Sequence, residues 1–224
     1  MKIATVIVTY NGAAWIAGAL QSLRESSHPC TAIVVDNASS DGTAALVRRE
    51  FTEATLIENG ANLGFGRANN LGIEAALRAG AEAVFLLNQD AYVTPEALRQ
   101  MVDFLEAQPG FDIVSPLHCS PDLTRVDPNT QSAYLQRHAS SYLSDACLDR
   151  VQPHYEIRGI NAAAWMLRAS VFRRAGGFDP LFFMYGEDDD LIERFSHHGL
   201  HTALLPAARI VHLRAKAPTP PQRW

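Results

Sequence analysis

The first half of the chain alternates short apolar runs with segments in which apolar residues recur at helical spacing. The apolar runs predict four buried strands, over residues 3–9, 32–36, 54–58 and 83–88. The helical spacing predicts four helices, over residues 13–25, 43–51, 67–79 and 95–107. Strands that are apolar throughout and alternate with helices are typical of a parallel sheet covered on both faces. We therefore predict an α/β fold for this half.

The second half of the chain is less regular. Residues 112–160 are polar and rich in turn-forming residues, which predicts an irregular or partly helical insertion. A strand that leads into a helix is predicted over residues 162–170, and an acidic helix over residues 188–198. Two short strands follow, "TALLP" and "RIVHL". Residues 214–224 are proline-rich, and we expect an extended or disordered tail.

Composition and charge narrow the class of protein. At 224 residues and 47% hydrophobic, the chain can bury a substantial core. Its net charge of −5 and pI near 5.9 argue against a partner nucleic acid, which normally requires clustered Lys and Arg. The apolar run at residues 3–8 is too short for a membrane span or a signal peptide, so we expect a cytoplasmic protein. The three cysteines are expected to be buried thiols: Cys30, Cys119 and Cys147.

Polar residues follow three of the predicted strands: Thr9-Tyr10-Asn11, Asp36-Asn37 and Asn88-Gln89-Asp90. Ligands bind open α/β sheets in the crevice beyond the carboxyl ends of the strands, so these three clusters should face one crevice. Asp36 can accept a hydrogen bond from a nucleobase or a ribose there, or it can simply form an Asx turn. Asp90 can bind Mg²⁺ or Mn²⁺ through oxygen, or it can be a turn residue.

Two further features are ambiguous by themselves. The stretch "GFGRANNLG" (64–72) follows the third strand and has Asn69 at its sixth position, so it is not a dinucleotide-binding fingerprint. Its glycines still allow close approach of a ligand, and Arg67 near a helix N-terminus suits a phosphate, unless it is an ordinary surface arginine. A single histidine on an apolar strand, His212, is more often a core residue than a metal ligand.

Four consecutive carboxylates, residues 187–190, follow Gly186 at the start of the acidic helix. One or two acids would complement the partial positive charge of a helix N-terminus. Four repel one another, and their flanks are apolar, so the run favours a functional role over a purely structural one. Crowding of like charges should also raise the pKa of at least one carboxylate.

Taken in order, "VIVTYNG", "VVDNASSDGT", "NLGFGRANNLG", "LLNQD", "GGFDPLFFMYGEDDDL" and "VHL" resemble the motif series of family 2 glycosyltransferases, in their rhamnosyltransferase-like branch. The resemblance implies a single GT-A domain over residues 1–213, with a Rossmann-like, mostly parallel central sheet flanked by helices on both faces. Residues 1–111 would bind the nucleotide sugar, and residues 112–213 would form a smaller acceptor-side half. The implied activity is inverting transfer of a sugar, rhamnose in this branch, to a hydroxyl of a saccharide or glycolipid in bacterial cell-surface polysaccharide synthesis.

The resemblance also assigns roles to residues. The nucleotide-binding residues would be Thr9, Tyr10, Asn11, Asp36, Arg67, Asn88 and Gln89. Asp90 matches the last position of the family's metal-binding D-x-D, and His212 would complete a site for Mg²⁺ or Mn²⁺. Asp188 matches the catalytic base, with Glu187 beside it. Asp190 would cap the helix or orient the acceptor, Asp189 would face solvent, and Trp165 would lie on the acceptor side.

Two departures from the family pattern leave alternatives open. Asn88 replaces the first acid of the D-x-D, which motivates a catalytically impaired sugar-nucleotide-binding relative. The chain ends soon after His212, so we expect that acceptor binding could need a partner or a homodimer. A sugar-1-phosphate nucleotidyltransferase would need a basic glycine-rich loop where "TYNGAAWI" stands. The expected donor is dTDP- or UDP-linked, because both bases offer an imide edge to Asp36, and peripheral association with the inner face of a membrane is compatible with a lipid-linked acceptor.

Overall fold

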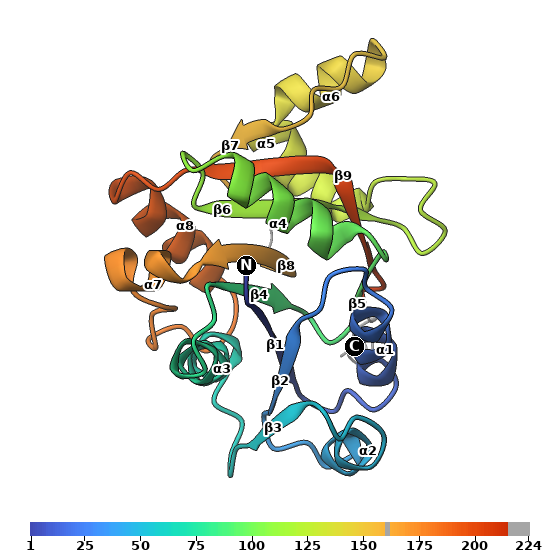
Figure 1. The fold of residues 1–224 in the computed structure, drawn as a ribbon, viewed down its shortest axis with the longest axis vertical. Coiled ribbons are helices and arrows are strands. Elements are labelled where there is room, and N and C mark those ends of the chain that lie inside the picture. Colours follow the sequence, from blue (N-terminus) through green and yellow to red (C-terminus); the bar gives the residue numbers. More distant parts are fainter. Residues whose placement is uncertain (160–161, 215–224) are drawn as a thin grey trace, which may run out of the picture.

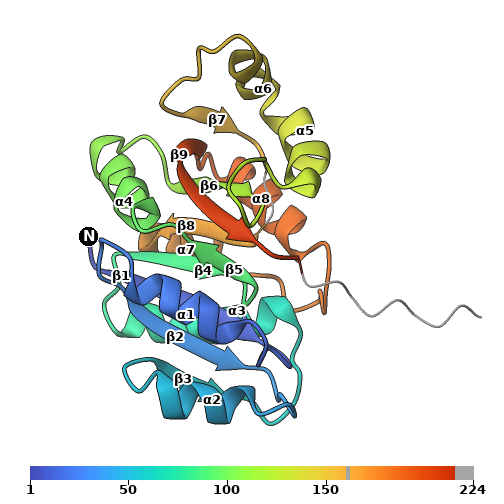
Figure 2. The ribbon, with the colours of Figure 1, turned by 90° about the vertical axis from the view of Figure 1, so that its right-hand side faces the viewer.

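The computed structural model describes residues 1–159 and 162–214, which form a central sheet flanked by helices (Figure 1). The strands are β1 (Ile3–Thr9), β2 (Thr31–Asp36), β3 (Thr55–Glu58), β4 (Ala83–Leu87), β5 (Ala91–Val93), β6 (Ile113–Cys119), β7 (Tyr155–Ile157), β8 (Ala164–Arg168) and β9 (Thr202–His212). The helices are α1 (Ile16–Arg24), α2 (Thr43–Glu50), α3 (Phe65–Arg78), α4 (Ala97–Ala107), the π-helical η1 (Thr130–Leu135), α5 (Gln136–His138), α6 (Ser140–Cys147), α7 (Ala169–Ala175) and α8 (Glu187–His197). Both views place α6 and β7 at one end of the molecule, beyond β9 (Figure 2).

The sheet is mixed rather than mostly parallel. Its strand order is β3-β2-β1-β4-β8-β6-β9-β5, and β7 also pairs with β9. The pairings among β1 to β4 are parallel, as predicted. β8 runs antiparallel to both β4 and β6, and β5 and β7 run antiparallel to β9. In the second half, β6 and β9 also pair in parallel, so the expectation of a mostly parallel sheet fails only for β5, β7 and β8. The sequence does not reveal this, because a fully buried strand has the same apolar sequence whichever way its neighbours run.

The main error of the sequence-based prediction concerns residues 112–160. Their first part is not an irregular insertion but β6, whose seven residues are all buried and which pairs with β8 and β9. The strand reads "IVSPLHC", and its polar residues and proline conceal it. The register of its pairing with β9 shifts between Pro116 and Leu117. The two short strands predicted near the C-terminus are one long strand, β9, and the predicted partly helical part corresponds to η1, α5 and α6.

Two apolar clusters hold the helices against the two faces of the sheet. One cluster contains side chains of α3, α7 and α8, and the other contains side chains of α1, α2 and α4. Successive residues of β4 alternate between them, since Phe85 belongs to one cluster and Leu86 to the other. A Cβ at Gly72 would lie 2.3 Å from Val6 Cγ1, so the glycine allows α3 to lie directly on β1. This contact positions the N-terminus of α3 at the carboxyl ends of the strands.

Four further expectations concern the cysteines, a membrane span, the tail and the division of the chain into two halves. All three cysteines are free thiols, but only Cys119 is buried; Cys30 is half-buried and Cys147 is exposed, so the expectation of buried thiols is wrong for Cys147. Within residues 1–159 and 162–214, no helix is long and apolar enough to cross a membrane. Of the predicted tail, residues 215–224 lie outside the described residues, and the division of the chain into two halves stays a prediction.

Candidate functional site

The carboxyl ends of β1, β2 and β4 meet, as the strand pattern predicts. Thr9 Oγ1 donates to Gln89 Oε1 at 2.6 Å, and the Tyr10 backbone N–H donates to the same oxygen at 3.1 Å. The Asn37 N–H donates to the Thr9 carbonyl at 2.7 Å. Gln89 therefore ties the end of β1 to the end of β4, and its side-chain oxygen is used in the protein's own hydrogen bonds.

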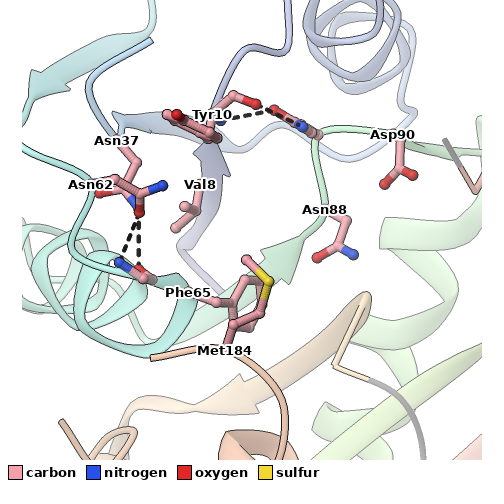
Figure 3. A pocket seen from close by; sticks show the side chains of 10 residues that line it. Val8, Tyr10, Asn37, Asn62, Phe65, Asn88, Asp90 and Met184 are labelled. Atoms are coloured by element: carbon pink, nitrogen blue, oxygen red, sulfur yellow. Dashed lines mark hydrogen bonds between the residues drawn. The ribbon is translucent and has the colours of Figure 1, made fainter. Parts of the chain in front are cut away.

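A hollow of about 170 Å³ opens at these strand ends (Figure 3). Its lining includes Val8, Tyr10, Asn37, Asn62, Phe65, Asn88, Gln89, Asp90 and Met184. A second hollow, of about 200 Å³, shares Phe65, Asn88 and Met184 with the first and is also lined by Ala162, Ala163, Tyr185, Glu187 and Asp188. The two hollows thus form one crevice that contains both Asp90 and Asp188.

Several crevice residues were missed by the sequence analysis. Asn62 follows β3 in "ENGANLG", so the polar end of the third predicted strand was an available signal. Its side-chain oxygen accepts a hydrogen bond from Asn37 Nδ2 at 2.7 Å. Phe65 begins α3, and Met184 lies in the apolar flank of the acidic run, where nothing in the residue pattern indicated a ligand-facing role.

Asp36 and Asn11 lie beside the crevice and do not line either hollow. Asp36 is 3% exposed; its Oδ2 accepts the Ser39 N–H at 3.0 Å, while its buried Oδ1 has no hydrogen-bond partner among the described residues. Asp36 therefore forms the turn through Oδ2 and still has Oδ1 available as a hydrogen-bond acceptor. An unpaired buried carboxylate oxygen costs stability, which favours a partner for this atom. The Asn11 side chain accepts the Ser40 N–H at 2.9 Å and holds the loop after β2 against β1.

Arg67 lines neither of the two hollows. It is exposed on the first turn of α3, and its Nε donates to the Pro180 carbonyl at 2.8 Å. Phe65, two residues earlier, lines the crevice, and residues two apart on a helix point in different directions. Arg67 thus lies outside the two hollows in this structure, and its role near the base or the diphosphate stays a prediction.

The acidic helix α8 presents its four carboxylates in four different ways. Glu187 is 6% exposed, and its Oε2 has no partner among the described residues. Asp188 lines the second hollow, and its Oδ1 accepts the Asp189 N–H at 3.1 Å. Asp189 is exposed, as expected, and Asp190 accepts a hydrogen bond from Arg194 Nε at 2.9 Å. Asp190 thus pairs within its own helix.

Burial raises the pKa of both carboxyl groups that line the second hollow. For Asp188, desolvation is the largest cause, and the charge of Asp189 adds to it. For Glu187, desolvation again comes first, followed by a hydrogen bond that lowers the pKa and by the charges of Asp188 and Asp189, which raise it. The pKa increase that charge crowding predicted is present, but burial contributes more than repulsion does.

Asp90 and His212 face each other at the other end of the crevice. His212 Nε2 lies 3.5 Å from Asp90 Oδ1, the Leu213 N–H donates to the Asp90 carbonyl at 2.9 Å, and β5 pairs with β9 directly beside them. His212 is 6% exposed, and its Nδ1 has no hydrogen-bond partner among the described residues. In the described part of the chain, no third His, Cys, Asp or Glu joins them.

This pair fits a Mg²⁺ or Mn²⁺ ion of the kind that serves nucleotide substrates. Such ions often take only one or two carboxylate ligands from the protein and keep water and substrate phosphates as the others. The Asp90 carboxylate with the His212 Nε2 beside it meets that requirement, and imidazole is also a common ligand of transition metals. Asn88 supplies a neutral amide at the position of the first D-x-D acid.

Trp165 is buried inside the protein. Its side chain is 0% exposed in β8, and its Nε1 has no hydrogen-bond partner among the described residues. The acceptor-side role expected for Trp165 would require an exposed ring, which the structure does not provide. Trp165 belongs to the cluster that contains α3, α7 and α8, whereas its neighbours Ala164 and Met166 belong to the other cluster, so both faces of β8 are covered.

Comparisons with known proteins agree with the motif series. A family model described as "Glycosyl transferase family 2" matches residues 5–175, and one described as "N-terminal domain of galactosyltransferase" matches residues 144–216. The chain is 29% identical to the N-acetylglucosaminyl-diphospho-decaprenol L-rhamnosyltransferase of Mycobacterium tuberculosis, over 94% of this chain and 75% of that protein. It is 24% identical to dTDP-rhamnosyl transferase RfbF of Shigella flexneri, over 94% of this chain and 69% of that protein.

Solved structures show the same fold. S. aureus TarS 1–349 in complex with UDP-GlcNAc superposes with a TM-score of 0.72 at 17% identity, over 100% of this chain. The mannosyltransferase PcManGT from Pyrobaculum calidifontis, in complex with GDP-Man and Mn²⁺, superposes with a TM-score of 0.67 at 23% identity, over 96% of this chain. The chain spans 62% and 57% of these two structures, and 37% of a longer TarS chain. These likenesses confirm the predicted GT-A fold class.

Proposed function

The chain belongs to glycosyl transferase family 2 and is a nucleotide-sugar-dependent glycosyltransferase, and from this premise we propose that it transfers rhamnose from a dTDP- or UDP-linked donor, with inversion, to a hydroxyl of a lipid-linked saccharide. The observation that carries the proposal is the crevice whose two hollows share Asn88: Asp90, which His212 contacts, lines the first hollow, and Asp188 lines the second. A site for the donor diphosphate and a base for the acceptor are thereby adjacent.

The proposed reaction is a single displacement at the anomeric carbon of the donor. Asp188 accepts the proton of the acceptor hydroxyl while that oxygen bonds to the anomeric carbon, and the bond from this carbon to the diphosphate oxygen breaks. Asp90 and His212 would hold the divalent cation, which supplies positive charge beside the departing diphosphate. Tyr10, Asn37 and Asn62 would line the nucleoside part of the crevice, with Asp36 behind them.

The relatives support the acceptor and donor classes proposed for this chain. The names of the two rhamnosyltransferases include a diphospho-decaprenol acceptor in one case and a dTDP-linked sugar in the other. An acceptor of this kind would bring the enzyme to the inner face of a membrane during glycan synthesis. A homodimer stays a prediction. The family match excludes the nucleotidyltransferase alternative, whereas a catalytically impaired relative remains the alternative that Asn88 motivates.

Titration calorimetry with dTDP, UDP and GDP, each with and without Mn²⁺, tests the nucleotide part of the proposal. We expect dTDP or UDP to bind, and Mn²⁺ to increase the affinity at least about tenfold, which corresponds to about 1.4 kcal/mol. Turnover with dTDP-rhamnose and the lipid-linked acceptor then separates an active enzyme from an impaired relative. Preference for GDP, or binding that Mn²⁺ leaves unchanged, would contradict the proposed donor site.

The transfer rate should depend on pH through Asp188. A base must be ionised, and burial together with the Asp189 charge raises the pKa of Asp188 above its usual range. We expect kcat to be constant near neutral pH and to fall as the pH decreases through this raised pKa, with a midpoint above the usual value of about 3.9. Asp189→Asn removes a like charge and should move the midpoint to lower pH. A midpoint that does not move in this variant would speak against Asp188 as the titrating base.

A further inference from the structure

The segment that precedes the acidic helix exposes four large apolar side chains. We define residues 181–185 as the apolar segment; in it, Leu181 is 87% exposed, Tyr185 85%, Phe183 58% and Met184 50%. Scattered exposed apolar residues are ordinary, but a contiguous group of them is typical of an interaction surface. The exposed group in residues 181–185 is therefore expected to be covered by a binding partner.

The backbone of the apolar segment is held in place. The Phe183 carbonyl accepts the Phe65 N–H at 3.1 Å, at the N-terminus of α3. The Leu181 N–H donates to Asp179 Oδ1 at 2.8 Å. A Cβ at Gly64 would lie 2.2 Å from the Phe183 carbonyl oxygen, so the segment and α3 are in close contact. These contacts hold the main chain of the apolar segment against the start of α3 through the Phe183 carbonyl, and they leave the four apolar side chains exposed.

The end of the apolar segment adopts a disfavoured conformation. Tyr185 has a φ of 70° and Gly186 a φ of 92°. Tyrosine in the left-handed region is unfavourable by roughly 1–2 kcal/mol, and such strain is found mainly at functional sites. The turn leaves Met184 and Tyr185 in the lining of the hollow that contains Asp188. The apolar surface is consequently continuous with the catalytic crevice.

Resting on the proposed transfer reaction, we propose that the apolar segment binds the lipid chain of the acceptor. The acceptor sugar enters the hollow beside Asp188, and the hydrocarbon chain lies across Leu181 and Phe183. Continuity with the crevice places the chain next to the sugar that reacts. The carboxylates of α8 follow the segment directly and disfavour an extended anionic bilayer surface. The hydrocarbon chain of the acceptor carries no charge, and only the diphosphate that joins it to the sugar would have to lie away from these carboxylates.

The test compares long-chain and short-chain acceptors. N-acetylglucosaminyl-diphospho-decaprenol in detergent and the same sugar diphosphate on a six-carbon chain are glycosylated with dTDP-rhamnose as donor. Leu181→Ser and Phe183→Ser should each raise KM for the long-chain acceptor about tenfold, because each removes a large part of one apolar contact. KM for the short-chain acceptor and the affinity for dTDP should not change. Leu148→Ser is the matched control, since Leu148 is also an exposed leucine (61%) and follows α6, far from α3 in Figure 1.

Four results would overturn the inference, the last of them being equal KM values of the wild type for the two acceptors. The first is an equal change of KM for both acceptors in the variants. The second is binding of wild-type protein to acceptor-free phosphatidylcholine vesicles that Leu181→Ser abolishes, since the bilayer itself would then cover the segment. The third is a wild-type dimer in sedimentation that Phe183→Ser dissociates. If the wild type, while binding dTDP, glycosylates neither acceptor, the proposed function fails; if it glycosylates both with the same KM, only this inference fails.

Discussion

Replacing Asp188 by asparagine is expected to lower the rate of sugar transfer by about 10²–10⁴-fold, the usual contribution of a general base. The asparagine keeps nearly the same shape but cannot accept the proton of the acceptor hydroxyl. Nucleotide affinity should not change, because Asp188 lines the second hollow, whereas Tyr10, Asn37 and Asn62, the proposed nucleoside contacts, line only the first. Single-turnover transfer assays together with dTDP calorimetry measure both quantities.

Asp189→Asn provides the control for this prediction. It removes the same charge from the adjacent position of α8, but the Asp189 side chain is exposed. We expect it to retain activity within a few-fold of the wild type at neutral pH. Equal losses in the two variants would mean that the negative charge of the helix, rather than a specific base, is required. Full activity of Asp188→Asn would exclude Asp188 as the base and would direct attention to Glu187, which lines the same hollow.

Replacing Asp90 by asparagine is expected to abolish the effect of Mn²⁺ on nucleotide binding. The carboxylate is the one charged oxygen ligand in the Asp90–His212 pair, and hard divalent cations bind mainly through such oxygens. The affinity for dTDP in the presence of Mn²⁺ should fall to the metal-free value, and transfer should decrease by at least about a hundredfold. Calorimetry with and without Mn²⁺ measures the first effect, and a transfer assay the second.

Two companion variants refine this experiment. His212→Gln should weaken the Mn²⁺ effect only partly, because the Asp90 carboxylate remains. Asp103→Asn removes an exposed carboxylate from α4 and should change nothing, which controls for the net charge of the protein. If Asp90→Asn retains the full Mn²⁺ effect, the cation is held elsewhere, and the crevice would need a different explanation for its aspartate–histidine pair.

The sequence was sufficient to predict the parts of this protein that have strong periodicity. The first strand was predicted to the residue, and the polar ends of β1, β2 and β4 do form one crevice. The prediction failed for β6, because Pro116 and His118 are buried in it although both residue types favour loops or surfaces. Burial of such residues depends on neighbouring strands from distant parts of the chain, which local periodicity does not reveal.

Some residues of the candidate site could likewise be predicted from the sequence, and others could not. Asp90 and Asp188 could be found because acids at strand ends and helix starts are chemically conspicuous. The position of Arg67 could not be predicted from the sequence. The direction of its side chain depends on the rotation of α3 about the helix axis, and the packing of Gly72 on β1 sets that rotation. The exposure of residues 181–185 was likewise hidden, since apolar residues in a sequence are normally assigned to the core.

The long strand β9 has a consequence for how the protein is made. His212 reaches Asp90 only after β9 has paired with β6 and β5, and β9 is the last strand of the described chain. A ribosome-bound chain therefore presents Asp90 without its histidine until β9 has emerged and paired with β5 and β6. The proposed cation site would accordingly form only once β9 is in place, and added nucleotide and Mn²⁺ would favour the folded molecule over partly folded precursors by mass action.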